Sequence, residues 1–142
     1  MIVVGQGVVD WVAAKTGSDF SLAARGIGLE RDGRLIAGVT YEKFNGRNVF
    51  VHHCIEGRIT RQYIWTICDY PFNQLKVERV TGHMPASNKK AIAFATKIGF
   101  RLEAVLKDAH PQGDLLYFVG RRNDFARWLN EDIHKSRLAM AA

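Results

Sequence analysis

Side chains that can accept a proton near neutral pH gather in one stretch of the chain. His52, His53 and Glu56 stand close together, and His83 follows at the end of a later β-branched segment. Imidazole and carboxylate groups act as general bases when a nucleophile must lose a proton. Because neighbouring side chains alternate across a strand, only one of His52 and His53 can face a given cleft. A structural role is the alternative for each of these four groups.

A second group of residues could bind an anion. Gly57 ends an apolar segment and precedes a helical pattern, with Arg58 and Arg61 beside it. Unpaired main-chain amides at the start of a helix, supported by the helix dipole, form an anion site. Many ligands of α/β sheets bind at the carboxyl ends of parallel strands. The pattern therefore indicates a phosphorylated ligand near Gly57, although any strand–glycine–helix connection gives a similar signal.

The two cysteines do not indicate a metal centre. Cys54 and Cys68 lack the CxxC spacing of zinc sites, and two cysteines make no disulfide framework. Cys54 could act as a nucleophile, but the sequence shows no pairing of cysteine with histidine. A small buried apolar residue is the simpler interpretation. We therefore predict no metal, reduced thiols and a cytoplasmic protein.

Composition narrows the class of protein. With 47% apolar, 11% aromatic and 24% charged residues, the chain is predicted to form one domain over residues 1–142 rather than a disordered polymer. No apolar run is long enough to span a bilayer, and the first residues do not resemble a signal peptide. The formal net charge of +6 favours an anionic partner, namely nucleic acid, an acidic protein or a phosphate-rich small molecule.

Hydrophobic periodicity predicts the elements that would position these residues. Asp32-Gly33 and Asn45-Gly46 are hairpin signals, so three antiparallel strands are expected after a short helix. Helical and strand patterns then alternate, and Pro71 is expected to end the helix before it. The predicted helices are residues 8–15, 59–68, 88–98 and 124–130, and the predicted strands are residues 27–31, 34–44, 49–56, 77–83, 100–107 and 115–120. This order predicts an α/β domain with a mixed central sheet flanked by helices.

The segment NKKAIAFATKIGFRLE, residues 88–103, resembles the signature of the GNAT family of N-acyltransferases. In that signature Asn opens a helix, a small residue follows three positions later, and Lys-x-Gly-Phe-x-x-Glu closes the motif. The matching residues here are Asn88, Ala91, Lys97, Gly99, Phe100 and Glu103. The order of elements also resembles the family over about residues 28–129. The nearest likeness is to the ribosomal-protein-acetylating branch and small phage-type relatives, which the segment GRRNDFARWL supports.

The resemblance implies acetyl-CoA as the co-substrate. Its pantetheine arm would lie between the strands 49–56 and 77–83, and an amide near His53 or Cys54 would polarise the thioester carbonyl. Asn88 would contact the coenzyme arm and Lys89 or Lys90 its phosphates, although a helix start also needs Asn88 as a cap. The residues implied for the pyrophosphate are Gly57, Arg58, Ile59, Thr60 and Arg61.

The sequence departs from the family in three places. The pyrophosphate loop keeps only Gly57, and Ala95 stands where many members have a Tyr acid, so the acid must be water or another residue, of which Tyr117 is the best candidate. The N-terminal segment 1–26 is short, so the strand 27–31 is expected to be an uncovered sheet edge, which predicts a homodimer. Alternatively, the first helix covers that edge. Residues 131–142 are expected to form a C-terminal tail.

These observations together predict an N-acetyltransferase that acts in a direct ternary complex. It would transfer an acetyl group from acetyl-CoA to an amine of an unidentified acceptor, either a small molecule or a protein. The predicted catalytic residues are Glu56, His53, His83 and Tyr117. One alternative is a basic nucleic-acid-binding or modifying accessory protein, which no aromatic-basic motif supports. Another is an inactive relative that only binds the coenzyme. No contact with a membrane is expected.

Overall fold

Three antiparallel strands form the first half of the sheet, where the turn residues predicted them. In the computed structural model, which describes residues 1–129, β2 (Arg25–Arg31), β3 (Arg34–Glu42) and β4 (Asn48–Ile55) pair in sequence order. Asp32 and Gly33 join β2 to β3 with φ angles of 54° and 76°, the left-handed conformation that a tight hairpin turn requires. The predicted three-stranded meander is confirmed.

An additional short strand precedes this meander. β1 (Ile2–Val4) pairs antiparallel with β2, with Ile2 opposite Leu29, and α1 (Gln6–Thr16) follows it directly. A strand of 3 residues shows too little alternation to be found in a sequence. Because β1 covers β2, the uncovered edge on which we based the homodimer prediction does not exist. That premise was wrong.

The helix α1 packs on the sheet at positions where the strands carry glycine. Val8 and Val12 of α1 are buried there. A Cβ added at Gly26 or at Gly28 would lie 3.0 Å from side-chain atoms of Val8. Glycine on β2 therefore lets the helix approach the sheet more closely than any side chain would permit.

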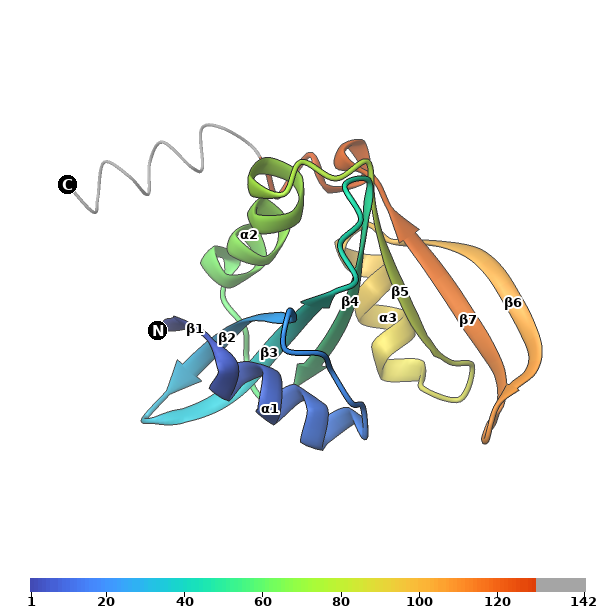
Figure 1. Cartoon of the computed structure of the whole chain (residues 1–142), viewed down its shortest axis with the longest axis horizontal. Coiled ribbons are helices and arrows are strands. Elements are labelled where there is room, and N and C mark those ends of the chain that lie inside the picture. Colours follow the sequence, from blue (N-terminus) through green and yellow to red (C-terminus); the bar gives the residue numbers. More distant parts are fainter. Residues whose placement is uncertain (130–142) are drawn as a thin grey trace.

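The opposite face of the sheet is covered by α2 (Arg61–Asp69) and α3 (Lys89–Ile98) (Figure 1). The α-helix α2 ends at Asp69, before Pro71 as predicted, but a π-helical turn, η1 (Tyr70–Gln74), continues directly from it. Pro71 has no N–H to donate to the Ile67 carbonyl, which accepts a hydrogen bond from the Tyr41 hydroxyl instead. Tyr63 of α2 and Phe72 of η1 are among the most deeply buried side chains of the core.

The second half of the sheet contains its one parallel pairing among residues 1–129. β5 (Arg79–Pro85) runs parallel to β4, and β7 (Gly113–Gly120) lies between β5 and the edge strand β6 (Arg101–His110). The order β1-β2-β3-β4-β5-β7-β6 makes a 7-stranded mixed sheet, so the predicted α/β fold is confirmed. We expected residues 100–107 to form a half-buried strand, with Leu102 and Leu106 on its buried face. Instead Leu102 and Leu106 are 54% and 38% exposed, because β6 forms an edge of the sheet.

The end of the described chain closes the core without a long helix. A 3₁₀ helix, η2 (Arg122–Phe125), stands where a longer helix was predicted. Phe125 is buried, and a Cβ at Gly120 would lie 2.3 Å from its ring, so glycine makes room for this side chain. Residue 130 and the predicted tail 131–142 lie outside the described residues. No helix within residues 1–129 has the length and apolar character needed to cross a bilayer.

Candidate active site

The parallel strands β4 and β5 separate towards their carboxyl ends. They pair from Asn48 opposite Arg79 to Val51 opposite Gly82, and no further. Beyond this point β4 continues against β3 as far as Ile55, and β5 continues against β7 as far as Pro85. Each strand therefore keeps its outer neighbour and has no strand partner on the edge that faces the other. This is the place where the sequence predicted a ligand.

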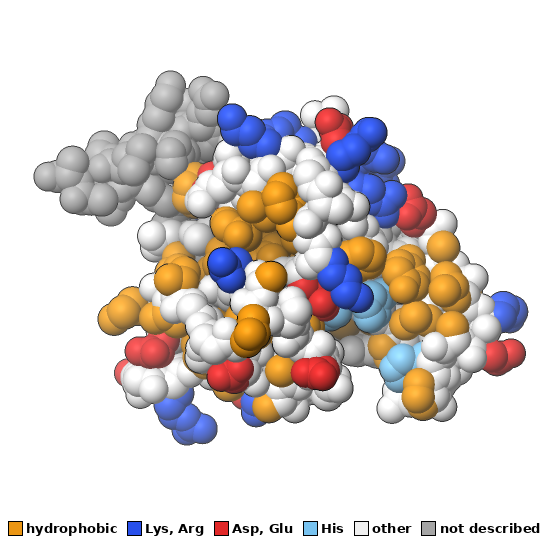
Figure 2. Space-filling model, in the orientation of Figure 1, with side chains coloured by type: hydrophobic (Ala, Val, Ile, Leu, Met, Phe, Trp, Pro, Cys, Tyr) orange, Lys and Arg blue, Asp and Glu red, His pale blue; other side chains and the backbone are white. Residues whose placement is uncertain are grey.

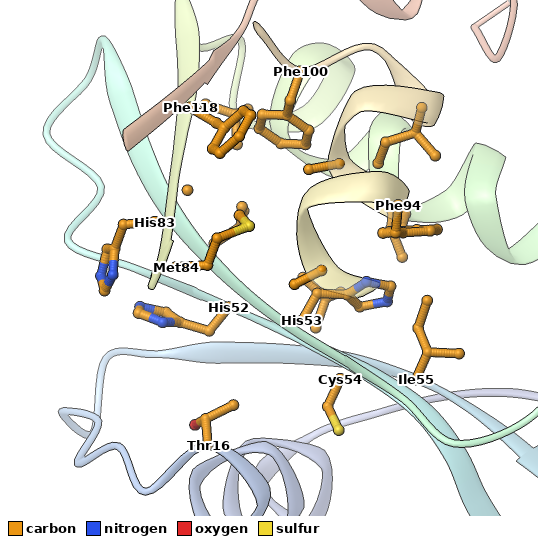
Figure 3. Close-up of a pocket in the computed structure, with 18 of the residues that line it drawn as sticks. Thr16, His52, His53, Cys54, Ile55, His83, Met84, Phe94, Phe100 and Phe118 are labelled. Carbon is orange, nitrogen blue, oxygen red and sulfur yellow. The ribbon is translucent and has the colours of Figure 1, made fainter. Parts of the chain in front are cut away.

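A cavity of about 750 Å³ occupies the opening between the two strands (Figure 3). From β4 it is lined by His52, His53 and Cys54, and from β5 by His83 and Met84. Figure 3 shows His52 and His83 close to one another at one side of the opening, while His53 lies nearer Phe94 of α3. A cavity of this size can hold the arm of a cofactor.

The first turn of α3 forms part of the rim of the cavity. Asn88 and Lys90 line it, whereas Lys89 does not. The side-chain oxygen of Asn88 accepts a hydrogen bond from the Ala91 amide at 3.1 Å, so Asn88 caps the helix and also borders the opening. Both interpretations of Asn88 are therefore compatible with its position. Of the two lysines implied for the coenzyme phosphates, Lys90 is therefore the one that lines the cavity.

The loop before α2 is partly engaged by the protein itself. The amides of Glu56 and Gly57 both donate to the Ile36 carbonyl, at 2.7 and 3.1 Å. Thr60 caps α2 by accepting a hydrogen bond from the Tyr63 amide at 3.1 Å. None of the five residues implied for the pyrophosphate lines the cavity. These residues are Gly57, Arg58, Ile59, Thr60 and Arg61. Their contact with a coenzyme stays a prediction.

Gly57 also has a packing role that the sequence did not reveal. A Cβ added there would lie 3.0 Å from the Cβ of Ile36 on β3. Its φ angle is not positive, so the reason for glycine is close packing and not an unusual backbone conformation. A larger residue at this position would disturb the fold as well as any ligand.

One face of the opening carries a connected set of titratable side chains. His52 Nε2 lies 2.5 Å from Glu42 Oε2 at the end of β3, without the alignment of a hydrogen bond. The His52 and His83 rings are 5.3 Å apart, and the His83 and Tyr117 rings are also 5.3 Å apart. These four residues, Glu42, His52, His83 and Tyr117, are called the acid–base cluster below. Of the four, His52 and His83 line the cavity, and Glu42 and Tyr117 lie behind them.

Burial controls the charge of the acid–base cluster. It lowers the pKa of both His52 and His83, while the Glu42 carboxylate opposes this shift in each of them. Both rings are therefore mainly neutral near pH 7 and can accept a proton. Glu42 would stabilise the charge that then forms.

Glu42 escaped the sequence analysis because no motif surrounds it. Its place in the cluster follows from strand register, since Thr40 pairs with His52 and Glu42 with Phe50. Glu42 and His52 are thus diagonal neighbours on one face of the β3–β4 hairpin. The Asn45-Gly46 turn predicts that the two strands pair, but it does not by itself give the register that places Glu42 beside His52.

The remaining predicted bases are in different surroundings. His53 faces the helices, where its Nε2 lies 2.9 Å from the Tyr63 hydroxyl, and burial lowers its pKa to about 4. Glu56 does not line the cavity and forms an exposed ion pair with Lys15 at 2.8 Å. The structure thus brings His83 and Tyr117 together but places His53 and Glu56 elsewhere.

Neither cysteine has the environment of a nucleophile. Burial, supported by the charge of Glu56, raises the pKa of Cys54, which also lines the cavity. Burial raises the pKa of Cys68 to about 12. Both thiols therefore stay protonated near pH 7, and a thiolate is what attack would require. Within residues 1–129 no group of three or more potential metal ligands comes together.

The fold is shared with solved acetyltransferases. A variant of the spermidine N-acetyltransferase of Vibrio cholerae aligns with a TM-score of 0.63 and 20% identity, over 87% of this chain and 78% of that chain. Another structure, of a spermidine/spermine N-acetyltransferase from Vibrio cholerae, aligns with a TM-score of 0.69 and 16% identity, over 92% and 99% of the two chains. A probable acetyltransferase aligns with a TM-score of 0.62 and 22% identity, over 82% and 68%.

Sequence comparison gives no further assignment. No protein-family model matches the chain, and none of the curated proteins matches it. A shared fold at such low identity does not determine chemistry, which has to be argued from the site. The described residues of this chain have the GNAT-type fold of the acetyltransferases that they resemble.

Proposed function

We propose that this protein is an N-acyltransferase that takes an acetyl group from acetyl-CoA and transfers it to an amine. The observation that carries the proposal is the cavity between the separated ends of β4 and β5. The unpaired edges of these strands offer main-chain groups to an extended, amide-containing arm such as pantetheine. The fold shared with acetyltransferases and the signature from Asn88 to Glu103 support the same conclusion.

The phosphates of the coenzyme would lie at the positively charged mouth of the cavity. Lys90 lines that mouth, and the start of α2 carries Arg58 and Arg61. Main-chain amides at a helix start complement phosphate charge. The net charge of +6 is in keeping with an anionic co-substrate of this kind.

The acid–base cluster would carry the proton transfers. The amine nitrogen attacks the thioester carbonyl carbon, an amide bond forms and the carbon–sulfur bond breaks. We propose that neutral His83 accepts the proton of the amine and that Glu42, through His52, stabilises the resulting charge. Tyr117, beside His83, would protonate the departing thiolate. An amide of the unpaired edge of β4, near His53 or Cys54, would polarise the carbonyl.

The acceptor of the solved relatives is not carried over to this chain. Their names state spermidine, a polycation. Among residues 1–129, the charged and titratable side chains that line the cavity include Lys15, Lys90 and four histidines but no Asp or Glu. Several positive charges would find no partner there, so we propose an acceptor with a single amine.

Coenzyme binding is the first experiment. Addition of acetyl-CoA at about a millimolar should raise the melting temperature of the protein, because ligand binding stabilises the folded state by mass action. Calorimetry should give one site per chain. Absence of both signals would contradict the proposal. Release of free thiol from acetyl-CoA on addition of a pool of amines then separates an active enzyme from a protein that only binds the coenzyme.

A further inference from the structure

The cavity extends beyond the opening, into the space between the sheet and the helices α2 and α3. We call this extension the inner arm. Its lining includes Ile67 of α2, Phe72 of η1, Ala95 and Ile98 of α3, Phe118 of β7 and Phe125 of η2. All six side chains are apolar. The inner arm therefore reaches from the proposed reaction centre into the apolar core of the domain.

The polar groups near the inner arm are already engaged or neutral. The Tyr41 hydroxyl donates a hydrogen bond to the Ile67 carbonyl. The Cys68 thiol stays protonated, because burial raises its pKa to about 12. A charged or strongly polar group in the inner arm would thus lose its water without gaining a partner, which is costly. The inner arm suits an apolar guest.

Small residues connect the opening to the inner arm. Gly82 is the last residue of β5 that pairs with β4, and a Cβ added there would meet only Val51, at 3.7 Å. On the facing helix the corresponding lining residue is Ala95. A Tyr at position 95, as in many proteins with the signature described above, would add an aromatic ring at this wall. Gly82 and Ala95 together leave a passage where the acyl group of the donor would lie.

We propose that the inner arm binds an unbranched apolar acyl chain, so that an acyl-CoA with a chain longer than acetyl is a better donor than acetyl-CoA. This inference rests on the proposed function, because it needs the coenzyme arm between β4 and β5. The chemistry is unchanged: the acyl carbonyl carbon passes from sulfur to the amine nitrogen, the amine proton goes to His83, and the thiolate is protonated. The length of the acyl chain is what the inner arm selects.

The test is calorimetry of the full chain with acetyl-, butyryl-, hexanoyl-, octanoyl- and succinyl-CoA. Burial of methylene groups should strengthen binding roughly fourfold for each methylene added, until the inner arm is full. Succinyl-CoA should bind more weakly than butyryl-CoA, because its carboxylate would enter an apolar space. Equal or falling affinity from acetyl- to hexanoyl-CoA would overturn the inference while leaving acetyl transfer intact. Failure of all five to bind would instead contradict the proposed function.

Two variants of α3 locate the effect. Ala95→Phe fills the inner arm, so it should abolish the gain in affinity from acetyl- to hexanoyl-CoA. Ala93→Phe, on the exposed side of the same helix, should preserve both affinities and is the matched control. Should Ala95→Phe fail to fold, Ala95→Val gives the same test with a smaller side chain. An undiminished gain in a folded Ala95 variant would show that the chain binds elsewhere.

Discussion

The two faces of the sheet at the opening between β4 and β5 differ in their chemistry. On one face lie Glu42, His52 and His83, a carboxylate and two rings that can accept protons. On the other face lies His53, which is buried against Tyr63 and Phe94. One β4 strand supplies both faces, because adjacent histidines point in opposite directions.

Under the proposed function, the two faces would have separate tasks. The face with the acid–base cluster would receive the acceptor, and Figure 2 shows histidine side chains at the surface beside apolar side chains over β6 and β7. The face under α2 and α3 is apolar, which would suit the donor. Adjacent residues of the same type can thus differ in role, since environment sets whether a histidine titrates near neutral pH.

Loss of His83 should have the largest effect. We expect His83→Ala to lower kcat about 10²- to 10⁴-fold, the contribution of a positioned general base, and to leave acetyl-CoA affinity nearly unchanged. Glu56→Gln is the comparison, because Glu56 pairs with Lys15 away from the cavity. Steady-state kinetics on both variants decides whether His83 or Glu56 is the general base. A large loss in Glu56→Gln with a normal rate in His83→Ala would reverse the assignment of the base.

His53 should affect stability against acid. Its pKa falls from 6.5 to about 4 on folding, so the unfolded chain binds a proton first as the pH decreases. The unfolding free energy therefore falls by on the order of 3 kcal/mol between pH 6.5 and about 4. Below that range His53 is protonated in both states and causes no further loss. In His53→Gln the decline of the unfolding free energy, measured with urea at each pH, should be smaller by that amount.

An identical decline in His53→Gln and the wild-type protein would mean that His53 is not buried as a neutral ring. The contrast between the two faces of β4 would then be lost.

Gly57 tests the donor end of the cavity. Gly57→Val would block the approach of a phosphate to this loop, but the contact with Ile36 makes that variant ambiguous. We expect Gly57→Ala to destabilise the fold by about 1 to 3 kcal/mol through crowding. Gly57→Ala combined with Ile36→Val should recover part of this loss. Acetyl-CoA affinity is then measured in the double variant, where a normal value would place the phosphates away from this loop.

The sequence predicted the central architecture because its signals are local. Asp32-Gly33 determines a hairpin, and Asn88 and Gly99 bound a helix, so each element could be found within its own segment. The parting of β4 and β5 was expected from the family resemblance and not from these signals. The contact of Glu42 with His52 was missed, because it depends on register between strands. β1 was missed because 3 residues carry no pattern, and the length of the inner arm depends on packing among five elements.

The homodimer stays a prediction, but the structure moves its site from β2 to β6. The edge strand β6 is 10 residues long, whereas β1 at the other edge is 3 residues long. Some of the side chains of β6, among them Val105, are apolar and exposed. An unpaired edge of this kind tends to pair with another chain. If two copies of β6 pair antiparallel about Val105, Glu103 of each lies opposite the partner's Lys107, which joins unlike charges.

Light scattering should then give twice the 16.0 kDa of one chain. Val105→Lys should restore the monomer by placing two lysines face to face, while Val4→Lys, on the short edge, should leave the dimer intact. A wild-type mass of one chain would contradict the homodimer.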